Sequence, residues 1–246
     1  MTRKIVLSRC KSDDKVLSSL KNELRELEFS SSLEEIIDVE NSFIILYSWP
    51  TILSEDFINK QTCVLNVHNS LLPKYRGRHA FTWAMINGEK EVGYTLHKVD
   101  GGIDTGDIYA QLIIPVDSQI DINTLFEIAE TELASWLPSK LIQVIEKKAI
   151  PKKQNNNKAT YFRARRPEDS MIDLSQSYEK IYNFIRAQRP PYTKGAYLEI
   201  HGSRLYFGEV KKIPSGTLKN KDFIINDDIS IITRCLDAEI ELYRAC

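Results

Sequence analysis

The stretch Cys63–Ser70, C-V-L-N-V-H-N-S, decides how this chain folds. Its apolar start is typical of a buried strand. Asn66 and His68 are separated by one residue, so a strand here presents both side chains on one face of its sheet. A second strand-like segment, residues 92–99, ends in the glycine-rich run D-G-G-I-D-T-G-D, which holds Asp104. We therefore expect a polar site where a buried strand meets this loop.

Asn66, His68 and Asp104 form a chemically sufficient set. A neutral imidazole can accept a proton, and a carboxylate can hold that imidazole in one tautomer and stabilise its charged form. A carboxamide can donate a hydrogen bond to a developing oxyanion. None of these roles needs a metal ion, and none is predicted. His79 and His97 lie close by, and we expect both to be structural or rim residues.

The same region resembles a known family. The run N-V-H-N-S-L-L-P-K-Y-R-G (66–77), followed by G-Y-T-L-H-K-V-D-G-G-I-D-T-G-D-I (93–108), closely resembles the formyltransferases that use 10-formyltetrahydrofolate. The resemblance is clear over residues 43–116 and fainter beyond. It implies a catalytic triad at Asn66, His68 and Asp104, and 10-formyltetrahydrofolate as the co-substrate.

The resemblance also implies where the two substrates bind. It places the pterin of the folate against the loop after strand 42–47 and against the D-G-G loop, partly through backbone groups. The implied folate contacts are Thr51, Ile52, Leu53, Arg78, Asp100, Gly101, Gly102 and Ile103. Cationic and aromatic side chains suit the phosphates and rings of a nucleotide. The candidate acceptor contacts are Lys74, Tyr75, Arg76, Arg189 and Tyr192. Simple packing of Trp49 and Ile52, and a solvated Lys74, are open alternatives.

Strand and helix patterns alternate through the first part of the chain. Strands are expected at 4–7, 42–47 and 63–67, and helices at 16–28, at 33–39 and from Ser54. Such alternation predicts an α/β fold, a Rossmann-like and mostly parallel sheet flanked by helices. Only 65 residues precede Asn66, fewer than the resemblance implies, so the N-terminal part is shortened. No G-x-G-x-x-G follows the first strand, and a nicotinamide site is unsupported.

We expect a formyltransferase catalytic domain over residues 1–150 and a C-terminal region over 151–246. A long helical pattern covers 117–148, where Pro138 should kink or divide the helix. A polar linker (151–158), an arginine-rich segment, a helix (177–188) and R-P-P-Y (189–192) follow. R-P-P-Y resembles a motif of the sugar N-formyltransferases. Five short strand patterns then predict a small β-rich appendage: 196–200, 205–210, 223–225, 230–235 and 239–243.

The bulk composition is that of a soluble globular protein. The chain has 246 residues, a formal net charge of −1 and 42% hydrophobic residues. A protein that grips nucleic acid usually shows a basic surplus, so no nucleic acid partner is expected. No run reaches the roughly 20 apolar residues of a membrane span. Without C-x-x-C spacing or a metal pattern, the thiols are expected to be free in a cytoplasmic protein; they are Cys10, Cys63, Cys235 and Cys246.

The expected function is formyl transfer from 10-formyltetrahydrofolate to the amine of a nucleotide-linked amino sugar. The resemblance favours dTDP-4-amino-4,6-dideoxyglucose, for surface polysaccharide (O-antigen or lipopolysaccharide) biosynthesis, and a homodimer. Methionyl-tRNA formylation is the first alternative, and glycinamide ribonucleotide formylation the next. A folate- or nucleotide-binding protein without catalysis, and a hydrolase that releases formate, are alternatives from other classes.

Overall fold

The structure is a computed structural model that describes residues 2–11, 13–226 and 229–245. The chain divides into two compact units. Unit 1 comprises Met1–Ala80, Glu91–Pro115 and Glu127–Phe162, and unit 2 comprises Phe81–Lys90, Val116–Phe126 and Arg163–Cys246.

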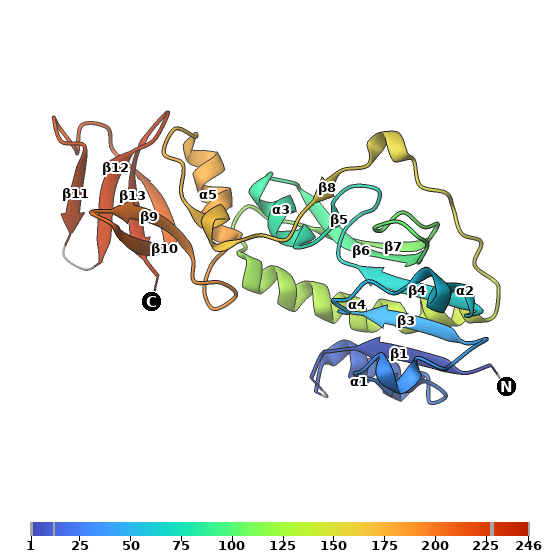
Figure 1. Cartoon of the computed structure of the whole chain (residues 1–246). Coiled ribbons are helices and arrows are strands. Elements are labelled where there is room, and N and C mark those ends of the chain that lie inside the picture. The colour runs from blue at the N-terminus through green and yellow to red at the C-terminus, as the bar shows by residue number, and fades with distance from the viewer. Residues whose placement is uncertain (1, 12, 227–228, 246) are drawn as a thin grey trace. The chain divides into compact units, whose positions relative to one another are not determined.

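Unit 1 contains a six-stranded sheet with the strand order β2-β1-β3-β4-β6-β7 (Figure 1). The first four strands pair in parallel, whereas β6 is antiparallel to β4 and to β7. This arrangement confirms the predicted mostly parallel α/β fold. The strands are β1 (Lys4–Ser8), β2 (Glu28–Ser30), β3 (Phe43–Tyr47), β4 (Cys63–His68), β6 (Glu91–Lys98) and β7 (Ile108–Pro115).

Helices flank this sheet: α1 (Lys15–Glu23), α2 (Glu55–Asn59) and α4 (Ile122–Ile145), which belongs to unit 1 from Glu127. The side chain of Asp14 caps α1 and that of Ser54 caps α2, each by accepting a backbone N–H of the first turn. The α2 residue Phe57 packs with Ile44, Leu46 and Val64 in an apolar core on one face of the sheet.

Three sequence expectations about these elements were wrong. The first helix ends at Glu23 instead of residue 28, because Glu28–Ser30 pairs with β1 as the edge strand β2. The helix expected over 33–39 is a single 3-10 turn, Glu34–Ile36. The helical pattern expected over 117–148 is the shorter helix α4, Ile122–Ile145, which continues through Pro138.

A two-stranded sheet in unit 1 joins two distant segments. Strand β5 (Arg76–Gly77) pairs in parallel with β8 (Tyr161–Phe162), so the end of the linker lies beside the S-L-L-P-K-Y-R-G loop.

Unit 2 contains most of α3 (Ala80–Ile86), the start of α4, α5 (Tyr178–Arg186) and a five-stranded antiparallel sheet. All five predicted C-terminal strands are present. They are β9 (Ala196–Ile200), β10 (Ser203–Ile213), β11 (Phe223–Asn226), β12 (Ser230–Arg234) and β13 (Glu239–Arg244), in the order β11-β12-β13-β10-β9. Ile181 and Ile185 of α5 pack against Phe207 and Ile240 of the sheet.

Two expectations about composition can be compared with the structure. Cys10, Cys63 and Cys235 are free, as predicted, while Cys246 lies outside the described residues. Among the helices of the described residues, none is long and apolar enough to cross a membrane.

Candidate active site

The pairing of β4 with β6 creates the polar face of the site. Asn66 lies opposite His97, and His68 lies opposite Thr95. Opposite residues in an antiparallel pair project from the same face, so strand pairing gathers these four side chains. Asp104 reaches them from the loop between β6 and β7.

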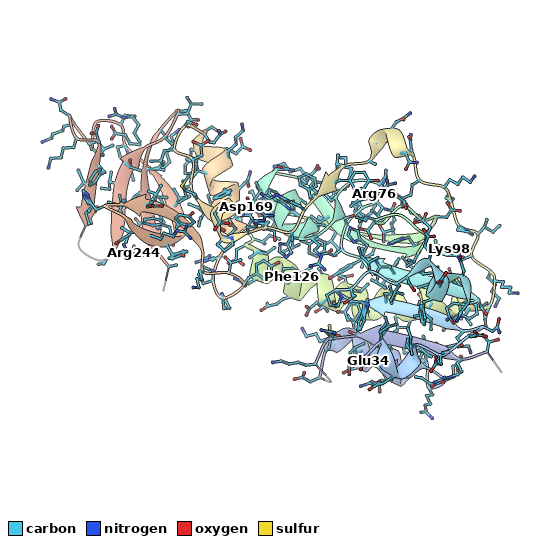
Figure 2. The ribbon with its side chains drawn as sticks, viewed as in Figure 1. Glu34, Arg76, Lys98, Phe126, Asp169 and Arg244 are labelled. Carbon is cyan, nitrogen blue, oxygen red and sulfur yellow. The ribbon has the colours of Figure 1, made fainter. Side chains whose placement is uncertain are left out.

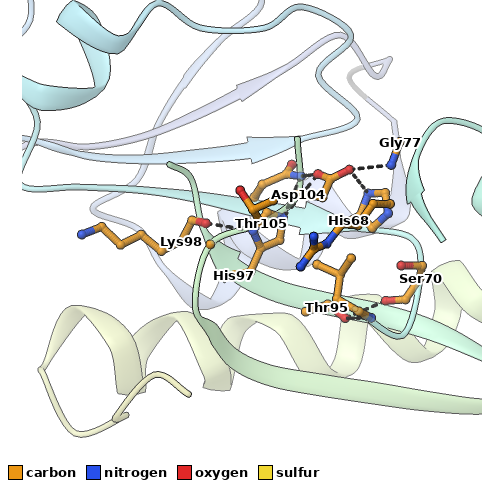
Figure 3. Close-up of polar contacts among 12 residues, drawn as sticks. His68, Ser70, Gly77, Thr95, His97, Lys98, Asp104 and Thr105 are labelled. Atoms are coloured by element: carbon orange, nitrogen blue, oxygen red, sulfur yellow. Dashed lines mark hydrogen bonds and ion pairs between the residues drawn. The ribbon is translucent and has the colours of Figure 1, made fainter. Parts of the chain in front are cut away.

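His68 is 6% exposed, and both of its ring nitrogens have defined neighbours. Its Nε2 lies 2.9 Å from the Tyr75 carbonyl oxygen. Because a carbonyl can only accept a hydrogen bond, Nε2 carries the proton of the neutral ring. Nδ1 is then the basic nitrogen, and it lies 3.7 Å from Oδ2 of Asp104 (Figure 3). A proton taken up at Nδ1 is therefore received next to a carboxylate.

Asp104 is an ionised carboxylate whose side chain is only 14% exposed. Gly77 donates its backbone N–H to Oδ2 at 2.8 Å, and Nε2 of His97 lies 3.6 Å from Oδ1. Burial opposes ionisation of Asp104, but His97, the charge of His68 and the Gly77 N–H outweigh it and lower the pKa to about 2. Gly77 has a positive φ, and a β-carbon there would lie 2.1 Å from the Phe162 carbonyl oxygen. Only glycine therefore lets this N–H approach the carboxylate.

Asn66 is oriented by His97, which the sequence analysis left outside the site. His97 is 2% exposed, and its Nδ1 donates to the Lys98 carbonyl at 2.8 Å. Its Nε2 therefore accepts from the Asn66 amide nitrogen at 3.2 Å. The same amide nitrogen lies 3.5 Å from Oδ1 of Asp104. His97 acts on Asn66 because the two residues lie opposite each other in the pairing of β4 with β6. The sequence around either residue does not reveal this register, so the role of His97 could not be predicted from it.

Burial lowers the pKa of His68, while the Asp104 charge and the bond to the Tyr75 carbonyl oppose the shift. The imidazole is therefore neutral at pH 7 and available as a base. Its charged form still has Asp104 as a partner.

Residues 70–75, which follow β4, are fixed by internal hydrogen bonds. Thr95 donates its hydroxyl to the Ser70 carbonyl at 2.6 Å and accepts the Leu72 N–H at 3.2 Å. Ser70 donates its hydroxyl to the Lys74 carbonyl. Tyr75 stacks on Phe162 with ring centroids 4.9 Å apart. This network holds the Tyr75 carbonyl against His68.

Two of the residues expected to contact the acceptor are turned inward. Arg76, labelled in Figure 2, is 1% exposed, and its guanidinium donates to Gln154, Asn156 and Tyr161. Tyr75 is 8% exposed. A guanidinium that is buried and engaged in this way does not face a phosphate in solvent, so Arg76 is not an acceptor contact in this structure, and Tyr75 meets the site through its carbonyl. Lys74 is exposed.

The residues expected to contact the folate behave differently from one another. Thr51 and Ile52 are exposed, Ile52 to 81%, whereas Leu53 is buried in the core beside Phe57. Arg78 is exposed, and its guanidinium donates to the Pro50 carbonyl.

The D-G-G loop carries the other expected folate contacts. Asp100 accepts hydrogen bonds from the Gly102 N–H and the Thr105 hydroxyl, which shape the loop. Ile103 is 55% exposed.

A cavity of about 360 Å³ lies between α2, the start of β4 and the D-G-G loop. Ile58, Val64 and Val99 supply apolar wall, and Asp100 and Gly101 line it from the loop. Val64 is two residues from Asn66 on β4, so both side chains project from the same face of the sheet; Asn66, His68 and Asp104 themselves do not line the cavity. Within residues 2–11, 13–226 and 229–245, no group of three or more His, Cys, Asp or Glu could hold a metal ion.

Comparison with known proteins identifies the family of the chain. The formyl transferase family matches residues 4–141, and the formyl transferase C-terminal domain matches residues 165–244. The chain belongs to the formyl transferase family. All three residues of the expected triad lie within the first match.

The relatives of this chain carry different names. It is 34% identical over 202 residues to the methionyl-tRNA formyltransferase of Caldanaerobacter subterraneus, covering 78% of this chain and 64% of that protein. It is 31% identical over 226 residues to the bifunctional polymyxin resistance protein ArnA of Wigglesworthia glossinidia, covering 91% of this chain and 33% of that protein. The chain thus spans less than two thirds of either relative.

A solved structure shares the fold over the whole length of both chains. The N-formyltransferase of Helicobacter canadensis, in complex with folinic acid and dTDP-3-aminofucose, has a TM-score of 0.73 at 18% identity and covers 99% of this chain and 100% of its own.

The remaining expected acceptor contacts, Arg189 and Tyr192, belong to unit 2. Arg189 pairs with Asp121 at 3.1 Å, and Tyr192 is 40% exposed and packs on Phe126 with ring centroids 4.9 Å apart. Both keep an exposed part, so both remain candidates.

The arginine-rich segment of this formyl transferase is largely engaged internally. Arg163 forms a two-bond pair with Asp169, and Arg165 stacks on Trp83 and donates to Gln188.

Proposed function

We propose that this formyl transferase moves a formyl group from 10-formyltetrahydrofolate to the amine of a nucleotide-linked amino sugar. The observation that carries the proposal is the arrangement at Nδ1 of His68. A neutral imidazole, buried and fixed through its other nitrogen, lies beside an ionised Asp104 and the amide of Asn66.

In this mechanism the acceptor amine attacks the formyl carbon and forms a tetrahedral species. Nδ1 of His68 takes the proton that the amine nitrogen must lose. The bond between the formyl carbon and N10 of the folate then breaks, and the same proton passes to N10. Asp104, 3.7 Å away, stabilises the intervening imidazolium. Proton transfer by a positioned side chain typically contributes about 10²–10⁴-fold in rate.

Asn66 is positioned to stabilise the oxyanion of the tetrahedral species. One amide proton is held by His97 at 3.2 Å, and the other makes only a long contact of 3.5 Å with Asp104. An oxyanion can compete for that second proton. Removing one oxyanion donor typically costs about 3–4 kcal/mol of transition-state stabilisation.

The cavity beside the D-G-G loop suits the pterin of the donor. A flat bicyclic ring needs apolar walls and a few fixed hydrogen-bonding groups. Ile58, Val64 and Val99 offer apolar wall, and Asn59, Gln61 and Asp100 are among the polar residues that line the cavity. The folinic acid bound to the Helicobacter canadensis relative supports a folate donor.

A nucleotide-linked amino sugar is the acceptor that the molecule supports best. The Helicobacter canadensis relative, which matches this chain over its whole length, was obtained with dTDP-3-aminofucose. The formal net charge of −1 gives no basic surplus for a polyanion. Our first choice is dTDP-4-amino-4,6-dideoxyglucose.

Methionyl-tRNA is the second candidate acceptor. It is favoured by the 34% identity with the Caldanaerobacter enzyme. Against it, Asp169 neutralises the charge of Arg163 in the densest basic segment.

The test is a tetrahydrofolate-release assay with 10-formyltetrahydrofolate and a panel of acceptors. The panel holds dTDP-4-amino-4,6-dideoxyglucose, dTDP-3-amino sugars, UDP- and GDP-amino sugars and methionyl-tRNA. Turnover that depends on one nucleotide sugar is the expected result. Turnover with methionyl-tRNA alone would overturn the acceptor, and formate release without any amine would indicate a hydrolase. No turnover in any arm would overturn the proposal as a whole.

A further inference from the structure

We propose that Gln154, in the linker after α4, is a positioning residue that holds Asp104 against His68, and that Arg76 in turn orients Gln154. The proposal rests on the proposed function, because it gives Asp104 its role in transfer. In this proposal the linker between α4 and β8 contributes a residue that positions the catalytic carboxylate.

Gln154 fastens the backbone of the loop on both sides of Thr105. Its amide nitrogen donates to the Asp104 carbonyl at 2.8 Å and to the Gly106 carbonyl at 2.7 Å. Asp104 has a φ of +53°, a left-handed conformation that is unfavourable for a residue with a β-carbon. The surrounding structure must hold such a conformation, and these two bonds act directly on it.

Arg76 determines which way the Gln154 amide points. Its Nε and Nη2 donate to Oε1 of Gln154 at 3.2 and 2.7 Å, and Nη2 also donates to Asn156 at 2.8 Å. A guanidinium can only donate, so the amide oxygen faces Arg76 and the nitrogen faces the loop. This role gives a reason for the burial of Arg76, in contrast to Arg78, which is exposed.

The same two-residue strand also touches the carboxylate itself. Gly77, next to Arg76 in β5, donates its N–H to Oδ2 of Asp104. Strand β5 therefore fixes the carboxylate directly through Gly77 and the backbone of Asp104 through Arg76 and Gln154. Residues supporting a catalytic group in this way affect rate, because a displacement of about 1 Å can cost about 10²-fold.

Loss of the Gln154 amide should let Asp104 leave His68, while Gln154 itself lines no part of the cavity. We expect kcat to fall about 10–100-fold, while KM for the folate and for the acceptor stays within about twofold, because Gln154 does not line the cavity. The groups that face His68 are Asp104, His97 and the Tyr75 carbonyl. Since Asp104 is the charge that favours the imidazolium, the pKa of His68 should fall in the variant.

The experiment uses the full chain with labelled histidines and follows the His68 resonance by NMR across pH, together with steady-state kinetics. Gln154→Ala removes both donor and acceptor. Gln154→Met keeps the side-chain volume without the donors, so it separates positioning from packing. Asn157→Ala is the matched control, an exposed amide on the same segment.

We expect a lower His68 pKa and a lower kcat at unchanged KM in both Gln154 variants, and wild-type values in Asn157→Ala. Wild-type kcat and His68 pKa in a folded Gln154→Met would overturn the proposal, as would an equal loss in Asn157→Ala. The titration needs no acceptor, so it decides the role of Gln154 even if the formyl acceptor proposed above is wrong.

Discussion

The two loops that carry expected folate contacts are built in opposite ways. In the loop after β6, Asp104 is held by Gly77 and Gln154. In the loop after β3, residues 48–53, the side chain of Ile52 is 81% exposed. The first loop carries the groups assigned to chemistry, and the second carries groups expected to bind the folate.

The contrast indicates which part of the site is preorganised. A group that acts on a developing charge must already be in place, because reorganisation during the reaction raises the barrier. A binding loop can instead adjust when the ligand arrives. Trp49 fits this second description: its ring stacks under Arg9, and within the described part of the chain its buried Nε1 has no hydrogen-bond partner.

The largest expected effect tests the preorganised groups, those assigned to the chemistry. Replacing the base by His68→Asn should lower kcat by about 10²–10⁴-fold, because no other group accepts the amine proton at that position. Binding of tetrahydrofolate should change by less than about threefold, as the cavity does not include residue 68. The measurements are the tetrahydrofolate-release assay and calorimetric titration.

His201→Asn is the control, since it makes the same exchange at an exposed residue in the turn between β9 and β10. Asn66→Ala should act in the same direction as His68→Asn. Activity that survived both site substitutions would end the mechanism and leave this protein as a folate or nucleotide binder.

The next prediction compares the stability effects of two adjacent residues in the loop after β3, Ile52 and Leu53. Leu53→Ala removes a buried side chain from the core around Phe57, which costs about 2–5 kcal/mol in the free energy of unfolding. Ile52→Ala should cost less than about 0.5 kcal/mol, because its side chain is exposed. Urea titrations measure both.

If residues 48–53 close over the pterin, Ile52→Ala should still raise KM for the folate severalfold while stability is unchanged. An unchanged KM in Ile52→Ala would show that the Ile52 side chain plays no part in binding the folate.

A third effect concerns the charge of Asp104. Its pKa of about 2 lies below the unfolded value of 3.8, so ionised Asp104 stabilises the fold above pH 4, and this contribution is lost as the pH falls through about 2. Asp104→Asn should therefore lower the free energy of unfolding by about 2 kcal/mol at pH 7. The difference from wild type should shrink between pH 4 and pH 2. A difference that did not depend on pH would mean that shape, and not charge, stabilises this loop.

The same contrast explains what could be predicted from the sequence. Asn66, His68 and Asp104 were recognisable because local spacing and a long motif contain them. His97 and Gln154 were missed, because one depends on the register of β4 with β6 and the other on a linker that returns 50 residues after Asp104. Arg76 was misassigned for a related reason, since its charge is visible in the sequence but its buried partners are not.

The smallest expected effect is a shift in the acid limb of the pH profile. His68 must be neutral to act as a base, and burial places its pKa below the ordinary value of 6.5. The logarithm of kcat should therefore fall with decreasing pH, with a midpoint below 6.5. Because the Asp104 charge favours the imidazolium, Asp104→Asn should move the midpoint still lower, while kcat on the plateau decreases. A profile recorded for wild type, Asp104→Asn and His201→Asn measures the shift, and the last should match wild type. A midpoint that rose in Asp104→Asn would show that the titrating base is not the imidazole beside this carboxylate. The mechanism would then need a base other than His68.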